Sequence, residues 1–426
     1  MQLLYNIFTY LYQIGFKGFS LWNPKAKLGI EGRKDWRKNL KNAIDAQGGS
    51  WIWMHCSSLG EFEQGRPVLE ALKKQYPYYN YALSFFSPSG YEVIKNYKES
   101  DIVFYLPLDT PQNARDLARI IQPKLWILSK YDYWYNHLKE QHKIGTKIIV
   151  VSAIFRPSHI YFKSYGNWFA KNLKQYIHHF FVQDKASKDL LKSIDISQVT
   201  IAGDTRFDRV KSIAKHTIPL IWVEKFKIDH KLIVIGSSWK EDETLWIDFI
   251  NNQLPNDWKV IIAPHEIKSS KIQNLKESLK GATLLFSDLK IELDKEKIPA
   301  TLLKNARVII VDVIGLLSTI YASADLAYVG GGFNKSGVHN TLEPTVFGTP
   351  TVIGPNFEKF NEVKLLKQEG IIFPIYDAAS FNETVTMLMQ NSDKRNAIAQ
   401  KANQFFENQP KSTALILNYL NQNNIL

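Results

Sequence analysis

The segment His55–Glu61 places a carboxylate at the point where an apolar run ends and a predicted helix begins. In an open α/β sheet, functional side chains gather at such turns, outside the carboxyl ends of the strands. Glu61 can act there as a general base if its surroundings bring its pKa close to the working pH. The alternative is an ordinary acidic residue in the first turn of a helix, where the helix dipole favours it.

The segment Phe86–Gly90 has the same arrangement of apolar run, turn and helix start. Hydroxyl groups and unpaired backbone N–H groups at a helix start suit an anion or a sugar. We therefore expect Ser87 and Ser89, together with Ser58 and Gly60, to contact an acceptor or a sugar. A plain helix cap followed by proline in the first turn explains the segment equally well.

The segment Gly203–Asp208 ends the first half of the chain and contains one cation, Arg206. Its guanidinium could neutralise a phosphate or a carboxylate of a ligand. It could equally form an ion pair with Asp204 or Asp208 at the surface.

Two glycine-containing turns occur in the second half of the chain. Gly236 and Ser237 begin a small-residue turn that resembles a phosphate-binding loop but lacks the full Gly-x-Gly-x-x-Gly fingerprint. Three glycines follow Val329 and permit close approach of a ligand to the backbone. A helix predicted to begin near Asn340 would direct N–H groups at a phosphate, and Glu343 could accept both hydroxyls of a ribose. A bland glycine-rich turn explains the glycines but not the cluster of polar residues behind them.

Parallel sheets are the elements that would hold these turns together. The apolar runs are continuous rather than alternating, which is typical of strands covered on both faces, and helical segments separate them. The sequence therefore predicts an α/β protein with two Rossmann-like, doubly wound parallel-sheet domains that face a central cleft. The predicted strands are residues 51–56, 81–86, 102–105, 125–128 and 147–151, then 232–235, 260–262, 308–311 and 325–329. The predicted helices include residues 65–75, 112–121, 241–251, 315–323 and 341–347.

A less regular stretch near residues 213–228 marks the predicted junction between the domains. We expect a membrane-associating segment over residues 1–40, a first Rossmann-like domain over 41–215 and a second Rossmann-like domain over 216–426. Residues 391–426 are predicted to form two helices that are able to pack back on the first domain.

The composition limits the class of protein. The chain has 426 residues, of which 45% are hydrophobic and 22% charged, as in soluble globular proteins of two domains. The net charge of +12 favours an anionic partner, such as an acidic membrane surface, a phosphorylated ligand or nucleic acid. The lone Cys56 cannot form an internal disulfide, and no Cys/His cluster has the spacing of a zinc site, so we expect no metal.

The first residues of the chain have the composition of an interfacial helix. Residues 3–19 are rich in Leu, Tyr, Ile and Phe, but Gln2, Asn6, Gln13 and Lys17 interrupt them, so they fit a spanning helix poorly. They lack the clear cleavage site of a signal peptide. A cluster of basic residues follows, and an apolar segment next to a basic cluster forms a two-signal membrane attachment. The alternative is a first helix packed on the core beside a solvated basic face. The cluster comprises Lys25, Lys27, Arg33, Lys34, Arg37, Lys38 and Lys41.

Taken together, the motifs resemble the Kdo transferases, which are inverting glycosyltransferases of the GT-B fold. Ser57–Glu61 resembles the family's Ser-Val-Gly-Glu, and Ser87–Gly90 resembles Thr-Pro-Thr-Gly. Gly203–Asp208 resembles Gly-Asn-Leu-Lys-Phe-Asp, and Gly337–Pro344 resembles Gly-His-Asn-Pro-Leu-Glu-Pro, with Phe347–Pro350 continuing that block. The blocks occur in the same order over nearly the whole chain.

The resemblance implies an acceptor domain over residues 41–215 and a CMP-sugar donor domain over 216–426. It also implies roles for individual residues. Glu61 matches the catalytic base, and Arg206 takes the place of a lysine that stabilises charge in the transition state. Asp132 is expected to contribute to catalysis beside them. The family needs no metal for catalysis. The residues implied in binding the CMP moiety are Gly236, Ser237, Pro264, His265, Ile314, Gly315, Leu316, Asn340, Thr341, Leu342 and Glu343.

The chain departs from the family pattern at several positions. After the predicted strand at 125–128, the family's Glu-Thr-Glu-Leu-Trp-Pro-Asn is replaced by residues 130–136, in which Lys130 takes the place of the first Glu and Asp132 that of the second. His265 stands where Arg is common, and Leu316 where Glu is common. We expect the same reaction with a locally altered site.

The resemblance implies an inverting, metal-independent and cofactor-free transfer of Kdo from CMP-Kdo to the lipid A precursor, lipid IVA. The expected partners are CMP-Kdo, the phosphorylated lipid and the cytoplasmic face of the inner membrane, to which the protein would attach peripherally or by its N-terminus; nucleic acid is not expected. One alternative is another GT-B enzyme, such as a UDP-sugar transferase or epimerase. The other is a basic, aromatic-rich nucleic-acid-binding protein.

Overall fold

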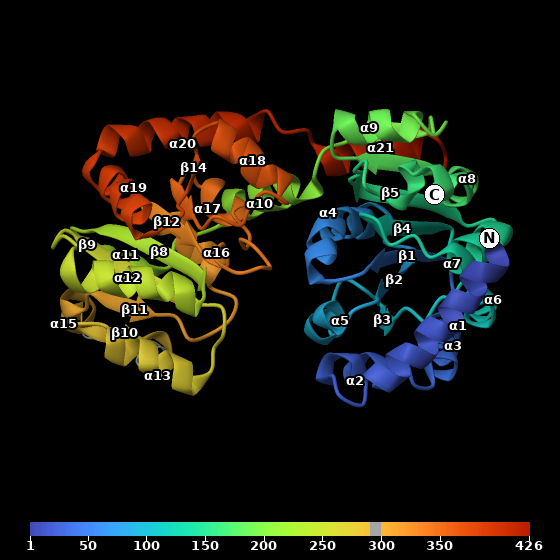
Figure 1. Cartoon of the computed structure of the whole chain (residues 1–426), viewed down its shortest axis with the longest axis horizontal. Coiled ribbons are helices and arrows are strands. Elements are labelled where there is room, and N and C mark those ends of the chain that lie inside the picture. Colours follow the sequence, from blue (N-terminus) through green and yellow to red (C-terminus); the bar gives the residue numbers. More distant parts are fainter. Residues whose placement is uncertain (290–299) are drawn as a thin grey trace. The chain divides into compact units, whose positions relative to one another are not determined.

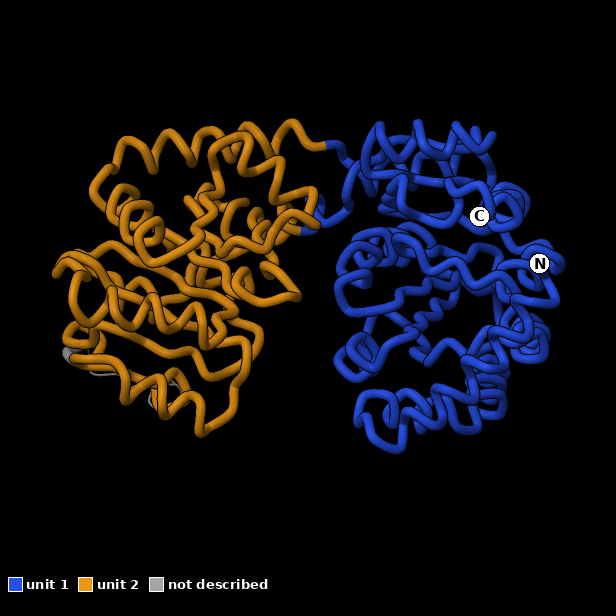
Figure 2. Tube along the Cα trace, in the orientation of Figure 1, with its two compact units in different colours: residues 1–209, 410–426 blue, residues 210–409 orange. Residues whose placement is uncertain are grey.

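The computed structural model describes residues 1–289 and 300–426 of the chain. These residues form two compact units, residues 1–209 with 410–426 and residues 210–409 (Figure 2). Each unit is built on one parallel sheet of seven strands with helices packed against it (Figure 1). The predicted fold class, an α/β protein with two parallel-sheet domains, is therefore confirmed.

The sheet of unit 1 has the strand order β3-β2-β1-β4-β5-β6-β7. Its strands are continuously apolar because successive side chains point to opposite faces and both faces are covered. Trp53 stacks on Trp126 of the neighbouring strand on one face, with ring centroids 4.2 Å apart, while Met54 packs with Phe62 on the other. The strands are β1 Trp51–Cys56, β2 Asn80–Phe85, β3 Ile102–Tyr105, β4 Leu125–Ser129, β5 Lys147–Ala153, β6 His179–Val182 and β7 Val199–Ile201. The helices are α1 Gln2–Phe19, α2 Pro24–Glu31, α3 Trp36–Gln47, α4 Leu59–Gln75, α5 Pro88–Ile94, α6 Pro111–Ile120, α7 Tyr135–Lys143, α8 Asn167–Tyr176, α9 Lys185–Lys192 and the start of α10 Thr205–His216.

The last helix of the chain, α21 (Ser412–Gln422), completes unit 1. Ile416 and Leu420 are fully buried in the same apolar cluster as Met54. The backbone N–H of Thr413 donates to a carboxylate oxygen of Asp208 at 2.6 Å. The amino-terminal sheet therefore depends on residues from the far end of the chain.

The sheet of unit 2 has the strand order β10-β11-β9-β8-β12-β13-β14. Trp246 lies at the centre of its core, with its ring 4.9 Å from that of Phe381 and 5.6 Å from that of Tyr328. The strands are β8 Lys231–Ser238, β9 Trp258–Pro264, β10 Thr283–Leu285, β11 Val308–Ile310, β12 Leu326–Val329, β13 Thr351–Ile353 and β14 Ile372–Pro374. The helices are α11 Ile221–Lys227, α12 Lys240–Asn252, α13 Ser269–Ser278, α15 Ala300–Asn305, α16 Leu317–Ile320, α17 Leu342–Thr345, α18 Asn361–Gln368, α19 Ala378–Gln390 and α20 Ser392–Glu407.

Each sheet has one strand from which the chain winds outward in both directions. In unit 1, β1 pairs with β2 and β4, and in unit 2, β8 pairs with β9 and β12. Such topological switch points are where open α/β sheets bind ligands. Glu61 follows β1, and Gly236 and Ser237 belong to the last residues of β8, so both motifs lie at the ends of these strands.

Several elements differ from the sequence prediction. β6, β7, β10, β13 and β14 were not predicted, although the equally short β3, β11 and β12 were. α4 begins at Leu59 rather than residue 65, so Glu61 lies inside its first turn. The stretch at 213–228, predicted as irregular, contains the end of α10 and all of α11.

Helix α1 exposes a row of large apolar side chains. Leu3, Leu4, Leu11 and Ile14 are each more than 60% exposed, and Leu21 and Trp22 just beyond the helix are more exposed still. Within the described residues, no helix is both long and apolar enough to traverse a bilayer.

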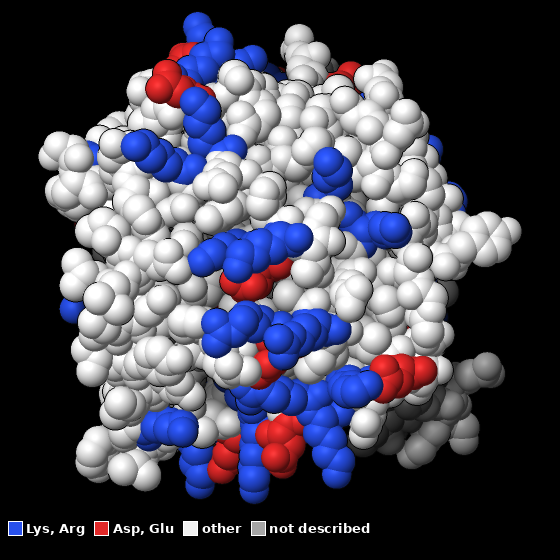
Figure 3. Space-filling view, turned by 90° about the vertical axis from the view of Figure 1, so that its right-hand side faces the viewer, with Lys and Arg blue, Asp and Glu red and all other residues white. Residues whose placement is uncertain are grey.

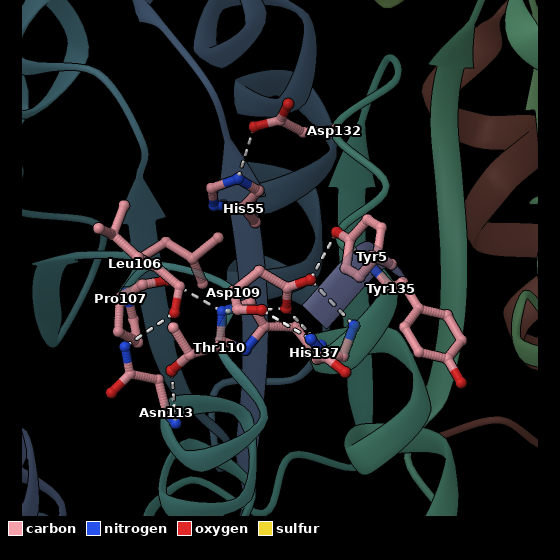
Figure 4. A network of polar contacts seen from close by, with 12 residues as sticks. Tyr5, His55, Leu106, Pro107, Asp109, Thr110, Asn113, Asp132, Tyr135 and His137 are labelled. Atoms are coloured by element: carbon pink, nitrogen blue, oxygen red, sulfur yellow. Dashed lines mark hydrogen bonds and ion pairs between the residues drawn. The ribbon is translucent and has the colours of Figure 1, made fainter. Parts of the chain in front are cut away.

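On its other side, α1 is attached to the rest of unit 1 through a buried carboxylate, that of Asp109 (Figure 4). The Tyr5 hydroxyl donates to its Oδ2 at 2.7 Å, and the backbone N–H groups of Asn136 and His137 donate to its two oxygens at 3.0 and 2.8 Å. Burial raises the pKa of Asp109 to about 7, although these three hydrogen bonds favour the ionised form. Tyr5 also packs edge-on against Tyr135 and lies beside Trp168. One phenol therefore combines a polar and an apolar attachment of α1.

We predict that Tyr5→Phe loosens α1. The substitution keeps the ring contacts but leaves a buried carboxylate with one donor fewer, at a cost of about 1–2 kcal/mol. Amide hydrogen exchange of α1 should accelerate by about 5- to 30-fold if α1 opens as a unit. Tyr10→Phe is the matched control, because Tyr10 lies on the same helix, is 47% exposed and has no hydroxyl hydrogen bond among the described residues. Equal exchange in the two variants would contradict this role of Tyr5.

Candidate active site

Glu61 is held between the ends of two neighbouring strands of unit 1. Glu61 is only 8% exposed to solvent. The backbone N–H of Ser57, just beyond β1, donates to its Oε2 at 2.5 Å. The hydroxyl of Ser129, the last residue of β4, donates to its carbonyl oxygen at 2.7 Å. The switch point of the sheet thus fixes both the backbone and the carboxylate.

The surroundings of Glu61 make its carboxyl a weak acid. Burial, and then the negative charge of Asp132, raise the pKa of Glu61 to about 7, while the Ser57 N–H and the charge of Lys130 act in the opposite direction. A carboxyl group with this pKa exchanges protons readily at neutral pH. This is the property that the sequence argument required of a general base.

Asp132 is connected to β1 through His55 (Figure 4). His55 Nε2 lies 3.1 Å from Asp132 Oδ2, and His55 Nδ1 lies 2.8 Å from the Ser84 hydroxyl on β2. The indole N–H of Trp53 donates to the same hydroxyl at 2.8 Å. Because an ionised carboxylate can only accept, His55 Nε2 carries a proton and donates it to Asp132. The aspartate is therefore positioned from two buried strands.

The two carboxyl groups of the site differ in acidity. Burial alone would raise the pKa of Asp132, but hydrogen bonds from His55 and Ser57 and the attraction of His55 hold it below its ordinary value. Asp132 therefore stays ionised beside Glu61, whose proton affinity is increased. Paired carboxyl groups with separated pKa values are typical of sites that perform acid–base chemistry.

Lys130 lies next to these carboxylates. It adopts a left-handed backbone conformation, with φ of 71°, directly after β4. Its ammonium lies 5.3 Å from the Tyr131 ring centroid, and its charge lowers the pKa of Glu61. Lys130 thus places a cation where the family pattern has an acid. Its charge lowers the pKa of Glu61, whereas the charge of Asp132 raises it.

The predicted acceptor residues lie at the starts of two helices: Ser58 and Gly60 at the start of α4, and Ser87 and Ser89 at the start of α5. The backbone N–H of Ser87 donates to the carbonyl of Ser57 at 2.8 Å, which joins the loop after β2 to the loop after β1. The Ser87 hydroxyl caps α5 by accepting the Ser89 N–H at 3.3 Å, and its oxygen lies 3.0 Å from the Ser89 hydroxyl. Ser58 makes no cap of this kind at the start of α4, and the space beside Gly60 is open. The structure brings the four residues together, and their contact with an acceptor stays a prediction.

Arg206 forms an ion pair, the second of the two interpretations given above. Its guanidinium meets Asp204 at 2.6 Å, and Asp204 also accepts a hydrogen bond from Gln64 of α4 at 3.0 Å. Burial alone would raise the pKa of Asp204, but Arg206 and Gln64 hold it below its usual range. Since Gln64 lies one turn after Glu61, the cation is tied to the same helix as the candidate base.

In unit 2, hydrogen bonds join the loops that carry the predicted donor-binding residues. The N–H of His265 donates to the carbonyl of Ser238 at 2.9 Å, and the N–H of Gly330 donates to that of Gly236 at 2.9 Å. The N–H of His339 donates in turn to Gly330 at 3.1 Å. The turns after β8, β9 and β12 therefore form one cluster at the end of the sheet.

Three stacked rings form the centre of this cluster. His265 was among the predicted donor-binding residues, whereas Trp239 and His339 were not. The ring of His265 lies 4.5 Å from Trp239 and 4.4 Å from His339. The indole N–H of Trp239 donates to His339 Nε2 at 3.0 Å. Burial and the neighbouring His265 lower the pKa of His339 to about 4, so the neutral ring carries its proton on Nδ1. An aromatic residue at 239 between two small residues and a lysine was the available signal.

The segment around Asn340 differs from its prediction. Residues 341–347 were predicted as a helix, but α17 spans only Leu342–Thr345, so its dipole is small. The Asn340 side chain instead bonds both ways: its Oδ1 accepts the Leu342 N–H at 3.2 Å, and its Nδ2 donates to Glu343 at 2.9 Å. Thr341 and Leu342 are buried beneath it. Any anion binding here rests on individual N–H groups rather than on a helix dipole.

Gly236 and Ser237 were predicted to begin a turn, but they lie in the last part of β8, where the pairing with β9 is irregular. A side chain at Gly236 would collide with the Tyr321 hydroxyl and Leu317, so only glycine lets the short helix α16 pack here. Ser237 has a left-handed φ of 53°. Ile314 is 91% exposed, Gly315 has φ of 96°, and Leu316 directly precedes α16.

A cavity of about 410 Å³ lies beside this cluster, between α12 and α13. Trp239 and Pro264 line it, together with Glu243, whose carboxylate accepts the Ser238 hydroxyl at 3.0 Å. Across the described residues, no group of three or more His, Cys, Asp and Glu side chains is arranged to hold a metal ion.

Comparison with known proteins bears on the identity of these sites. Residues 32–209 match the family model described as 3-deoxy-D-manno-octulosonic-acid transferase (kdotransferase). The chain is 27% identical over 372 residues to the 3-deoxy-D-manno-octulosonic acid transferase of Chlamydia pneumoniae. The aligned region covers 84% of this chain and 81% of the relative. It is 25% identical over 415 residues to that of Chlamydia trachomatis serovar D, covering 94% and 90%. The relative from Haemophilus influenzae is 23% identical over 359 residues, covering 81% and 80%.

Solved structures share the fold at low sequence identity. The UDP-GlcNAc 2-epimerase from Neisseria meningitidis bound to UDP-GlcNAc has a TM-score of 0.58 at 12% identity, covering 87% of this chain and 100% of that chain. A complex of S. aureus MnaA with UDP has a TM-score of 0.56 at 12% identity, covering 88% and 98%.

The two seven-stranded parallel sheets give the chain a GT-B-like α/β fold. The sequence relatives support a glycosyltransferase with this fold. The resemblance to the Kdo transferase family, indicated by the order of the motifs, is confirmed by the relatives over most of the chain.

We predict that Asp132→Asn shifts the acid limb of the pH–rate profile for glycosyl transfer to lower pH. Removing a negative charge next to Glu61 lowers the pKa of Glu61, so its basic form persists at lower pH. The expected shift of the midpoint is up to about one pH unit. An acid limb that stays in place, or moves upward, would contradict the electrostatic coupling. Asp116→Asn is the control, because Asp116 pairs with Arg37 away from this network.

Proposed function

We propose that the protein transfers Kdo from CMP-Kdo to the lipid A precursor, lipid IVA, with inversion at the anomeric carbon and without a metal or cofactor. The observation that carries the proposal is the buried carboxyl of Glu61, whose pKa of about 7 suits a general base. Glu61 takes the proton of the acceptor hydroxyl while the hydroxyl oxygen bonds to the anomeric carbon. The bond from that carbon to the phosphate oxygen breaks, and CMP leaves with the electron pair.

The donor side supplies hydrogen-bond donors for the departing phosphate. His339 is neutral and carries a proton on Nδ1. The side-chain amide of the next residue, Asn340, is fixed by its hydrogen bonds to Leu342 and Glu343. Fixed N–H dipoles stabilise developing negative charge without reorganisation. Arg206 is the cation that we propose for the transition state, and its pairing with Asp204 fixes the orientation of the guanidinium.

Attachment to the cytoplasmic face of the inner membrane is part of the proposal. The exposed apolar side of α1 would enter the interfacial region, and the basic segment that follows would meet anionic headgroups. On the side of unit 1 that carries α1 and α3, Lys and Arg side chains gather on one part of the surface (Figure 3). The attached protein would thereby reach its lipid acceptor at the surface of the bilayer that contains it.

We predict that Glu61→Gln lowers the transfer rate by at least about 100-fold, since loss of a general base typically costs 10²–10⁴-fold. Product formation is measured by mass spectrometry with CMP-Kdo and lipid IVA. Affinity for CMP should be unchanged, because Glu61 lies in unit 1 and the proposed donor residues lie in unit 2. Turnover of Glu61→Gln at the native rate would remove Glu61 as the base.

We predict that Glu343→Gln weakens binding of CMP by roughly tenfold, as expected when a charged acceptor of ribose hydroxyls is replaced by a neutral one. Calorimetric titration with CMP and with UDP measures the effect. Glu383→Gln, at an exposed site on α19, is the matched control. If the native protein bound UDP as tightly as CMP, the alternative of a UDP-sugar enzyme would be favoured.

A further inference from the structure

A second cavity lies in unit 1, among the three amino-terminal helices. It has a volume of about 350 Å³ and is bounded by α1, α2 and α3 and by the loop that follows β3. Ile30, Trp36 and Leu108 form an apolar wall. The charged residues that line it are Lys17, Glu31, Arg33, Lys34 and Arg37, four cations and one anion. The cavity is therefore amphiphilic, with an excess of positive charge.

Arg33 is a nearly buried cation that no acidic side chain balances in the described part of the chain. Its guanidinium donates to the backbone carbonyls of Leu106, Gly29 and Phe86 at 2.8, 2.7 and 2.6 Å. Burial lowers the pKa of Arg33 only to about 10, so the charge persists at neutral pH. A guanidinium has five N–H donors, and three of them are used by these carbonyls. A buried positive charge without a counter-ion attracts an anion strongly.

The other cations of the cavity divide into two kinds. Arg37 is already paired with Asp116 at 2.6 Å and also donates to Asn113. Lys17 and Lys34 are exposed and have no ion pair within the described residues. The single acid, Glu31, faces the exposed Lys27 at 3.9 Å, a distance at which an exposed pair contributes little. Lys17, Arg33 and Lys34 are thus the cations available to a ligand.

Two residues that line the cavity, Lys17 and Arg33, connect it with α1 and, through aromatic contacts, with the segment that carries Asp132. Lys17 belongs to the last turn of α1. The guanidinium of Arg33 lies 4.9 Å from the ring of Phe86, which stacks at 4.9 Å on Trp134, two residues after Asp132. Burial raises the pKa of Tyr12 on α1, and the charges of Arg33 and Asp132 both act on it. A ligand in the cavity would therefore lie close to the loop that carries Asp132.

We infer that this cavity binds a phosphate group of the lipid acceptor through Arg33, Lys17 and Lys34, with the adjoining apolar part of the lipid against Trp36 and α1. The inference rests on the proposed function, because it supplies a binding site for that acceptor. A phosphate monoester carries up to two negative charges and several acceptor oxygens, which match a guanidinium fork and two ammonium groups. An amphiphile with a phosphate next to acyl chains fits both the charge and the apolar wall.

The test compares two double variants in neutral-detergent micelles, which present no anionic membrane. Lys17→Gln/Lys34→Gln removes two charges from the cavity. Lys171→Gln/Lys174→Gln removes two exposed charges from α8 of the same unit, which also have no ion pair among the described residues. Kinetics are measured with lipid IVA and with the same lipid after enzymatic removal of its phosphates. Both variants retain Arg33, so its hydrogen bonds to Gly29 of α2 and to Leu106 and Phe86 stay intact.

We expect the cavity variant to raise KM for the phosphorylated acceptor by about tenfold or more with kcat retained, the signature of lost ground-state binding. The control variant should stay within about twofold of the native KM, as expected for exposed charges outside a site. With the dephosphorylated acceptor, the native protein and the cavity variant should have the same KM.

Two results would overturn the inference: an equal rise of KM in both double variants, or an equal rise on both acceptors. The first would show a general effect of surface charge, and the second would show that the lysines act on another part of the lipid. Either result leaves the proposed function intact. That function fails separately if the native protein forms no Kdo-containing product from CMP-Kdo and lipid IVA.

Discussion

The chemistry of unit 1 depends on keeping Asp132 ionised beside Glu61. Burial raises the pKa of Glu61 and so disfavours its ionised form. Two buried carboxylates close together repel each other, and the cheapest relief is for one of them to hold a proton. The structure decides which one by hydrogen bonding: Asp132 accepts from His55 and Ser57, whereas the carboxylate of Glu61 is supported chiefly by the backbone of its own turn. His55 is oriented toward Asp132 because its own strand, β1, is buried and its Nδ1 bonds to the Ser84 hydroxyl on β2. The separation of the two pKa values is therefore a consequence of the switch point of the sheet.

Burial of polar groups also explains how α1 can present apolar side chains outward and still stay attached. A helix normally attaches to a domain by its apolar stripe, but in α1 much of that surface is exposed. The attachment of α1 comes instead from Tyr5, which bonds to Asp109. The end of the next helix, α2, is attached by Arg33, which bonds to three carbonyls. Such buried bonds are costly to break singly, since each broken bond leaves an unsatisfied group. They leave the apolar side chains of α1 available for another surface.

How much the sequence could predict follows from the range of the interactions involved. The strand at 51–56 was predicted to the residue, because a continuous apolar run is a local signal, and Glu61 was identified from its place after that run. The three-residue strands β7 and β13 each include a threonine and were not predicted, whereas the equally short β11 is wholly apolar and was. The ring stack of Trp239, His265 and His339 joins residues 100 positions apart, and no local pattern reports such contacts. The pairing of Arg206 with Asp204 is short-range and was foreseen as one of two possibilities, but only side-chain geometry distinguishes an ion pair from a ligand contact.

The departure at Lys130 illustrates how a site can change residues and keep its acid–base balance. At this position the family pattern has an acid, and a third acid close to Glu61 and Asp132 would raise the proton affinity of Glu61 further. Lys130 acts in the opposite direction, so the pKa of Glu61 reflects burial and Asp132 on one side and Lys130 with the Ser57 N–H on the other. The left-handed backbone at Lys130 places this residue at the turn where β4 ends, next to the loop of Asp132. A general base requires a pKa near the working pH rather than a particular set of neighbours, and this balance meets that requirement with a different set of residues.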